Sequence, residues 1–206
     1  MFEPAMIFIL FFVTLGPLKL LGPFAQRTRG LPDTMVHQIA WRAFVIAVAA
    51  AIVGGFAGTT MLVKWQVSMP ALTLAGGLIF LLVALKIVLQ QYEPVLDAPS
   101  QPALPASPTK AACSLLFPLI LTPYGIAAVI SLLSRSETTL MTLTIVAIVM
   151  LVMVLNLLTM WFVRKILVSF VPVVLQIVGS VLGVLQVALS VQFIIQGLKA
   201  LNVLSG

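Results

Sequence analysis

Two proline-containing runs in otherwise apolar stretches are the residues of this sequence best suited to bind a solute. In the first run, residues 16–25, Pro17 and Pro23 flank Lys19 and Gly22. Each proline removes a backbone donor and clashes with the carbonyl four residues earlier, so we expect a helix to open here. Backbone groups freed inside a membrane persist only where protein or a water-filled cavity satisfies them. The run therefore predicts a broken membrane helix at a candidate substrate-binding site.

A second run of the same kind lies about a hundred residues later, at 117–125. Its candidate substrate-binding residues are Pro118, Thr122, Pro123, Tyr124 and Gly125. Discontinuous helices in corresponding positions of two halves are typical of secondary transporters, whose substrate sites form where the halves meet. The two runs together predict a transporter-like core.

Lys19 is the residue of the first run whose chemistry points most specifically to a function. A lysine near the middle of a bilayer costs about 2.5–3.5 kcal/mol on insertion scales. Two functional interpretations stand: a counter-charge to a substrate carboxylate, or an organiser of the carbonyls freed around Pro23. The third interpretation is a side chain that extends to the nearby cytoplasmic surface. The sequence leaves all three open.

The other polar side chains of note within the apolar stretches are Thr122, Asn156, Thr159, Gln176, Gln186 and Gln192. Asn156, an amide between two leucines, is a candidate substrate-binding residue. An interhelical hydrogen bond, typically about 0.6 kcal/mol, is the favoured alternative. No Asp or Glu falls within an expected span, which argues against proton coupling through a buried carboxylate. Coupling to Na⁺ through backbone carbonyls, and uncoupled export or exchange, stay open.

The inventory predicts no enzyme and no cofactor. Cys113 is the only cysteine and His37 the only histidine, so neither an intramolecular disulfide nor a cysteine–histidine metal cluster can be assembled. No nucleophile–base pair or phosphate-binding loop is present either.

Composition shows which elements must position these residues. The chain has 206 residues, of which 62% are hydrophobic and 8% charged, with a mean hydropathy of +1.23. A soluble domain carries about 25% charged residues, so we expect an all-α, polytopic membrane protein. Six stretches reach the roughly 20 apolar residues that a spanning helix needs: 5–24, 43–63, 70–89, 111–133, 140–163 and 172–198.

An internal repeat organises these spans. Pro17 and Pro118 are 101 positions apart, Pro23 and Pro123 are 100 apart, and Gly77 and Gly179 are 102 apart. We expect a first three-helix repeat at 1–89, a proline-rich cytoplasmic linker at 90–110 and a second repeat at 111–206. Because each repeat has an odd number of spans, the two are inverted, which gives a 3+3 fold with broken first and fourth helices.

Basic residues predict the orientation. The net charge is +6, but lysine and arginine are scattered at span ends rather than gathered in a patch, so we expect no nucleic acid partner. Their excess in the first, third and fifth connections places those connections in the cytoplasm and both termini outside. The expected partners are the lipid bilayer and a small-molecule solute, and a homo-oligomer is left open.

The runs 75–86 and 191–197 resemble the third and last spans of the MarC family of integral membrane proteins, and the paired-proline breaks are similar too. The resemblance covers nearly the whole chain apart from the linker. It implies a bacterial or archaeal cytoplasmic-membrane protein of six spans, distantly like amino-acid exporters of the LysE type, with small neutral amino acids as substrates of some members. The chain departs from the usual family pattern at Lys19 and Tyr124. These residues should narrow the substrate pocket and change its charge.

Two hypotheses follow. In the first, the protein is a secondary transporter or exporter of a small polar solute that works by alternating access between the repeats. In the second, it is a membrane binding or assembly protein that moves nothing and acts through its cytoplasmic linker.

Overall fold

The computed structural model describes residues 3–90, 107–169, 172–201 and 203, and no strand occurs among them. The helices in chain order are α1 Pro4–Leu15, α2 Leu18–Arg27, α3 Asp33–Lys64, α4 Met69–Gln90, α5 Pro108–Leu115, the π-helix η1 Leu116–Ile120, α6 Pro123–Ser134, α7 Thr139–Ser169 and α8 Pro172–Ala200. The predicted linker, 90–110, falls largely outside the described residues.

The long helices match the thickness of a bilayer. α4 has 22 residues, and α3, α7 and α8 have 32, 31 and 29. At about 1.5 Å per residue, even 22 residues cover roughly 30 Å of hydrocarbon. Within the described residues, five segments are long and apolar enough to cross a membrane, and the first of them is the interrupted pair α1 and α2. The chain is therefore an all-helical, multi-pass membrane protein.

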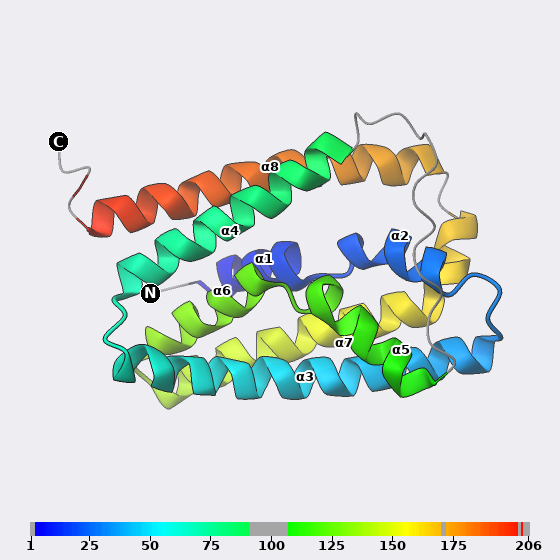
Figure 1. Ribbon diagram of the computed structural model, residues 1–206, viewed down its shortest axis with the longest axis horizontal. Coiled ribbons are helices and arrows are strands. Elements are labelled where there is room, and N and C mark those ends of the chain that lie inside the picture. The colour runs from blue at the N-terminus through cyan, green and yellow to red at the C-terminus, as the bar shows by residue number, and fades with distance from the viewer. Residues whose placement is uncertain (1–2, 91–106, 170–171, 202, 204–206) are drawn as a thin grey trace.

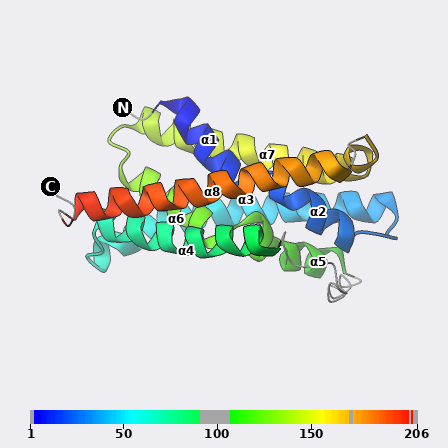
Figure 2. The same ribbon diagram turned by 90° about the horizontal axis from the view of Figure 1, so that it is seen from above.

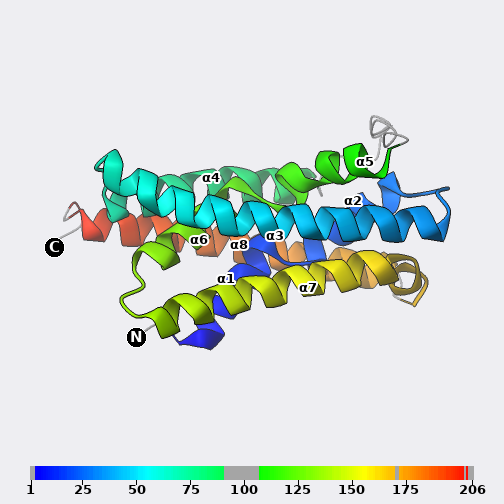
Figure 3. The ribbon, with the colours of Figure 1, turned by 90° about the horizontal axis from the view of Figure 1, so that it is seen from below.

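The interrupted segments lie in the interior of an elongated bundle. In Figure 1, α4 and α8 run side by side along one face, and α3 and α7 form the opposite face. Figure 2 shows the same α4–α8 pair from above, and Figure 3 shows α3 beside α7 from below. α1 packs against α6 and α7, between these two faces. The core accordingly includes buried Phe11 and Leu15 of α1 and Leu115 and Ile120 of the second interrupted segment.

Small residues allow the helices to approach closely, as expected for contacts in lipid. A Cβ on Gly77 of α4 would lie 3.0 Å from the backbone nitrogen of Ile194 in α8. A Cβ on Gly197 of α8 would lie 3.0 Å from the backbone nitrogen of Leu74 in α4. Each helix of the α4–α8 pair thus contributes one glycine at which the backbone of the other helix approaches closely.

One expectation needs correction. Pro23 does not open the chain, because α2 continues through it to Arg27; the break in the first span lies at Gly16 and Pro17 alone. The predicted fourth span, 111–133, is divided into α5, η1 and α6. Breaks in the first and fourth predicted spans are confirmed. The full 3+3 inverted repeat stays a prediction.

Candidate functional site

The first break is produced by a glycine followed by a proline. α1 ends at Leu15, and Gly16 is extended, with φ −76° and ψ 175°. A Cβ at Gly16 would lie 1.8 Å from the carbonyl oxygen of Phe12, so a side chain does not fit here. Pro17 has no N–H, and the Val13 carbonyl therefore loses the donor that a continuing helix would supply. The end of α1 presents bare carbonyls to the protein interior.

Two amide side chains from distant helices satisfy carbonyls at this end. Gln186 Nε2 of α8 donates to the oxygen of Val13 at 3.3 Å, across 173 residues of sequence. Asn156 Nδ2 of α7 donates to the oxygen of Leu15 at 2.8 Å, across 141 residues. Both amides are buried. The end of α1 is held by helices of the second half of the chain.

The carbonyl of Thr14 receives two donors. Lys19 Nζ lies 2.5 Å from its oxygen, and Thr122 Oγ1 donates to the same oxygen at 3.1 Å. Lys19 therefore points into the bundle, which excludes the interpretation that it extends to the membrane surface. It organises freed carbonyls, as one hypothesis expected, but those of the Pro17 break rather than carbonyls around Pro23.

The second break faces the first. η1 is a π-helix through Pro118, and the Leu121 backbone is extended after it. Thr122 is the N-cap of α6: its Oγ1 accepts a hydrogen bond from the backbone N–H of Gly125 at 3.2 Å. A Cβ on Gly125 would lie 2.3 Å from Leu15 Cδ2. The N-terminus of α6 and the C-terminus of α1 are thus in direct contact.

A similar contact, with the roles of the two halves exchanged, occurs at the second break. Pro118 deprives the Ser114 carbonyl of its helical donor, and Arg27 Nη1 of α2 donates to that oxygen at 3.2 Å. The proline of each half therefore exposes a carbonyl that a side chain of the opposite half satisfies.

Aromatic rings adjoin the site. Lys19 Nζ lies 5.6 Å from the centroid of the Tyr124 ring, within the range of a cation–π contact. The same ring stacks on Phe80 of α4, with centroids 4.4 Å apart and planes at 15°. Phe80 also lines a small cavity of about 30 Å³ between α4, α6 and α8, with Gly76, Ala127 and Ser131 among its other walls. This volume suits about one water molecule.

Two buried polar side-chain atoms have no hydrogen-bond partner among the described residues: Ser134 Oγ, at the α3–α4 end of the bundle, and Asn156 Oδ1, at the breaks. Asn156 is 2% exposed. Leaving such a group unpaired costs about 1–3 kcal/mol. At this position beside the two breaks, Asn156 Oδ1 can accept a hydrogen bond from a ligand or a water molecule.

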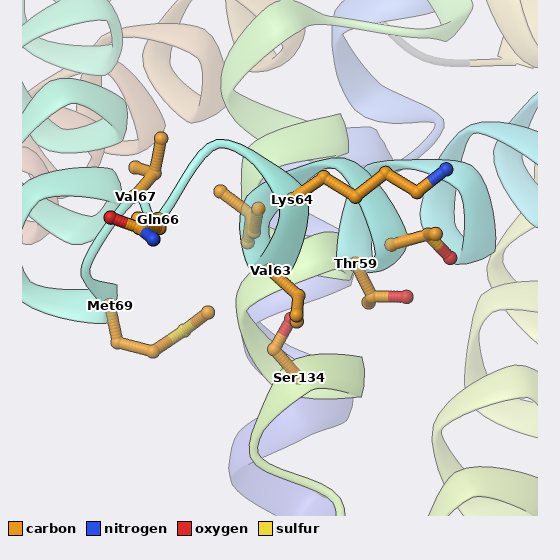
Figure 4. A pocket seen from close by; sticks show the side chains of 9 residues that line it. Thr59, Val63, Lys64, Gln66, Val67, Met69 and Ser134 are labelled. Atoms are coloured by element: carbon orange, nitrogen blue, oxygen red, sulfur yellow. The ribbon is translucent and has the colours of Figure 1, made fainter.

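A larger open hollow of about 740 Å³ lies elsewhere, where α3 turns into α4 (Figure 4). Thr59, Lys64 and Ser134 line it together with aliphatic side chains. It lies at the end of the bundle, where α3 connects to α4, whereas the breaks lie between the helices, and we therefore place the candidate site at the breaks.

The structure gathers most of the predicted substrate-binding residues and separates the rest. Those brought together are Pro17, Lys19, Thr122, Pro123, Tyr124, Gly125 and Asn156. Gly22 is exposed and Pro23 lies within α2, so neither adjoins the break. Pro118 lies within η1, and its side chain is outside the described part. Sequence reasoning did not place Gln186 or Phe80 at the site; only the missing N–H of Pro17 signalled that the Val13 carbonyl needs a donor.

Comparison with protein families gives one finding. The model described as MarC family integral membrane protein matches residues 3–202. No curated protein and no solved structure matches the chain.

Proposed function

The chain belongs to the MarC family of integral membrane proteins, and from this premise we propose that it is a secondary transporter or exporter of a small polar solute. The observation that carries the proposal is the 3.1 Å hydrogen bond from Thr122 to the Thr14 carbonyl. It joins two helix breaks that are 108 residues apart in sequence. Helix breaks that meet between two halves of a membrane bundle form solute sites, because their freed backbone groups and helix ends can bind polar ligands.

The chemistry of the site favours a solute with a hydrogen-bond donor and an anionic group. Asn156 Oδ1 offers a buried acceptor for a solute N–H or O–H group. The N-terminus of α6, beginning at Pro123, carries the positive end of the helix dipole and favours an anionic group. Small neutral amino acids combine both features, and they are the first solute class that we propose.

The arrangement described is a closed one. The cavity beside the breaks holds about 30 Å³, which is too small for an amino acid, so transport requires the two halves to separate there. Among the described residues, side-chain hydrogen bonds of Arg27, Thr122, Arg135, Asn156 and Gln186 cross between the halves. A hydrogen bond between membrane helices contributes about 0.6 kcal/mol on average. Alternating access requires these hydrogen bonds, and the apolar packing around them, to rearrange at the breaks.

We propose that both termini face the outside and that the protein sits in a bacterial or archaeal cytoplasmic membrane. α1 begins and α8 ends toward the same end of the bundle, where the α3–α4 turn also lies (Figure 1). Arg27, Arg29 and Arg42 lie near the opposite end, before and within the start of α3. An excess of basic residues marks the cytoplasmic side.

Flux into proteoliposomes tests the proposal. Vesicles loaded with the protein and empty vesicles receive a panel of labelled neutral amino acids and small organic anions. We expect faster uptake of at least one solute with protein, and loss of that uptake in Asn156→Leu, which removes the unpartnered acceptor. Gln192→Leu is the matched control, because Gln192 is an exposed amide on α8. Equal flux in loaded and empty vesicles across the panel would refute transport of these solutes.

A further inference from the structure

The carbonyls at the end of α1 resemble a cation site. Opened backbone carbonyls and the C-terminal ends of half-helices coordinate Na⁺ in many transporters, because both present partial negative charge. At the end of α1, the oxygens of Val13, Thr14 and Leu15 have lost the regular helix beyond them. A coupling ion would be expected at such a place.

A side-chain cation already lies there. Lys19 Nζ is 2.5 Å from the Thr14 oxygen and 5.6 Å from the centroid of the Tyr124 ring. The carbonyl, the negative end of the α1 dipole and the aromatic face all stabilise a positive charge at this point. Lys19 lies only four residues after the end of α1, in the first turn of α2. The change of direction at the break therefore places its ammonium group beside the carbonyls at the end of α1.

Carboxylates do not account for the placement of Lys19. The acidic residues within the described part of the chain are Glu3, Asp33 and Glu137, and all three are exposed. None of them is a candidate to pair with an ammonium in the bundle interior. Among the residues that the structure describes, the Thr14 carbonyl and the Tyr124 ring are the groups that hold it.

We propose that the Lys19 ammonium is a tethered cation that occupies the place of a coupling ion at the end of α1, so that the protein works without Na⁺. This inference rests on the proposed transport function. It assigns Lys19 to the Thr14 carbonyl of the break rather than to the solute, and it makes this end of α1 a cation site that becomes available when the lysine side chain is removed.

Thermal unfolding of the purified protein in detergent tests the site without requiring flux. Wild type, Lys19→Ala and Lys86→Ala are compared in NaCl and in N-methylglucamine chloride at equal ionic strength. Lys86 is an exposed lysine near the end of α4, and its removal is the matched loss of one charge. We expect the Tm of wild type and Lys86→Ala to be the same in both salts.

Lys19→Ala should have a lowered Tm that Na⁺ partly restores. At about ten times the Kd, a bound ion should raise the Tm of a chain this size by about 3–6 °C. Butylammonium chloride, which supplies the missing amine, should restore Lys19→Ala in the same way and leave wild type unchanged. If neither cation stabilises Lys19→Ala, the carbonyls are not a cation site and the inference is wrong.

Wild-type measurements decide the inference if Lys19→Ala does not fold. Specific ²²Na⁺ binding by wild type, or wild-type flux that stops when N-methylglucamine replaces Na⁺, would overturn it while leaving transport intact. No ²²Na⁺ binding and equal Tm in both salts would support it. Failure of every solute to cross the membrane would refute the transport function, and the unfolding experiment would still show whether Lys19 fills a cation site.

Discussion

Replacing Thr122 with valine should weaken the contact between the two breaks by a predictable amount. The hydroxyl accepts the Gly125 N–H as the N-cap of α6 and donates to the Thr14 carbonyl of α1. Valine has the same shape, and the extended backbone at Thr122, with φ −91° and ψ 147°, suits a β-branched residue. Only the two hydrogen bonds are lost. Loss of an N-cap costs about 1 kcal/mol, and loss of a hydrogen bond between membrane helices costs about 0.6 kcal/mol.

The combined loss is about 1.5–2 kcal/mol, which lowers the Tm of a chain of this length by roughly 3–8 °C. Tryptophan fluorescence during heating in detergent measures the change. Thr122→Ser keeps the hydroxyl and should remain within about 2 °C of wild type. Thr144→Val is the second control, because the Thr144 hydroxyl bonds only to Leu140 of its own helix and is exposed. If Thr122→Val and Thr144→Val unfold at the same temperature, the contact between the breaks contributes nothing and the reasoning fails.

Three further substitutions test the geometry of the breaks, each by the Tm in detergent. Gly125→Ala places a Cβ 2.3 Å from Leu15 Cδ2, and such overpacking should cost about 1–3 kcal/mol. Gly76→Ala is the control, because its Cβ meets its nearest neighbour at 3.4 Å, and it should lower the Tm less. A larger fall in Tm for Gly76→Ala than for Gly125→Ala would contradict the contact between Gly125 and Leu15. Gly16→Ala places a Cβ 1.8 Å from a backbone oxygen, so it should lower the Tm more than Gly125→Ala does. Asn156→Leu loses one donor but also removes one unpartnered acceptor, so its Tm should fall less than that of Thr122→Val even though flux is lost; a larger fall would mean that the amide is structural.

Local rules predicted that the first span would be interrupted within the run 16–25. They did not predict which of its two glycine–proline pairs would end the helix. Gly16–Pro17 and Gly22–Pro23 are the same dipeptide, six residues apart. The first ends α1, and the second continues through α2. A proline in a helix removes one hydrogen bond and need not end the helix. Nothing within the run distinguishes the two pairs, and the prediction of an opening at Pro23 was wrong for that reason.

Tertiary donors distinguish them. The carbonyls before Gly16 meet Gln186, Asn156 and Thr122, which lie 108 to 173 residues further along the chain. A helix end inside a membrane is tolerated where its freed carbonyls find such partners. Apolar periodicity and proline positions do not indicate which amide side chain, from which helix, will donate a hydrogen bond to these carbonyls. Length, composition and span positions could therefore be predicted, whereas the donors that fix the site could not.

The crossed pattern of donors explains how two breaks can be both stable and movable. Pro17 frees the Val13 carbonyl, which Gln186 of the second half satisfies, and Pro118 frees the Ser114 carbonyl, which Arg27 of the first half satisfies. Each of these two carbonyls is satisfied by the opposite half, so each half depends on the other for a backbone group that its own proline leaves unpaired. The two halves also share a packed apolar core, but these links are side-chain hydrogen bonds, and a solute that supplies equivalent donors and acceptors can replace them. A ligand shifts such an equilibrium only by its differential affinity for the two states, and freed backbone groups that change partners are a direct source of that difference.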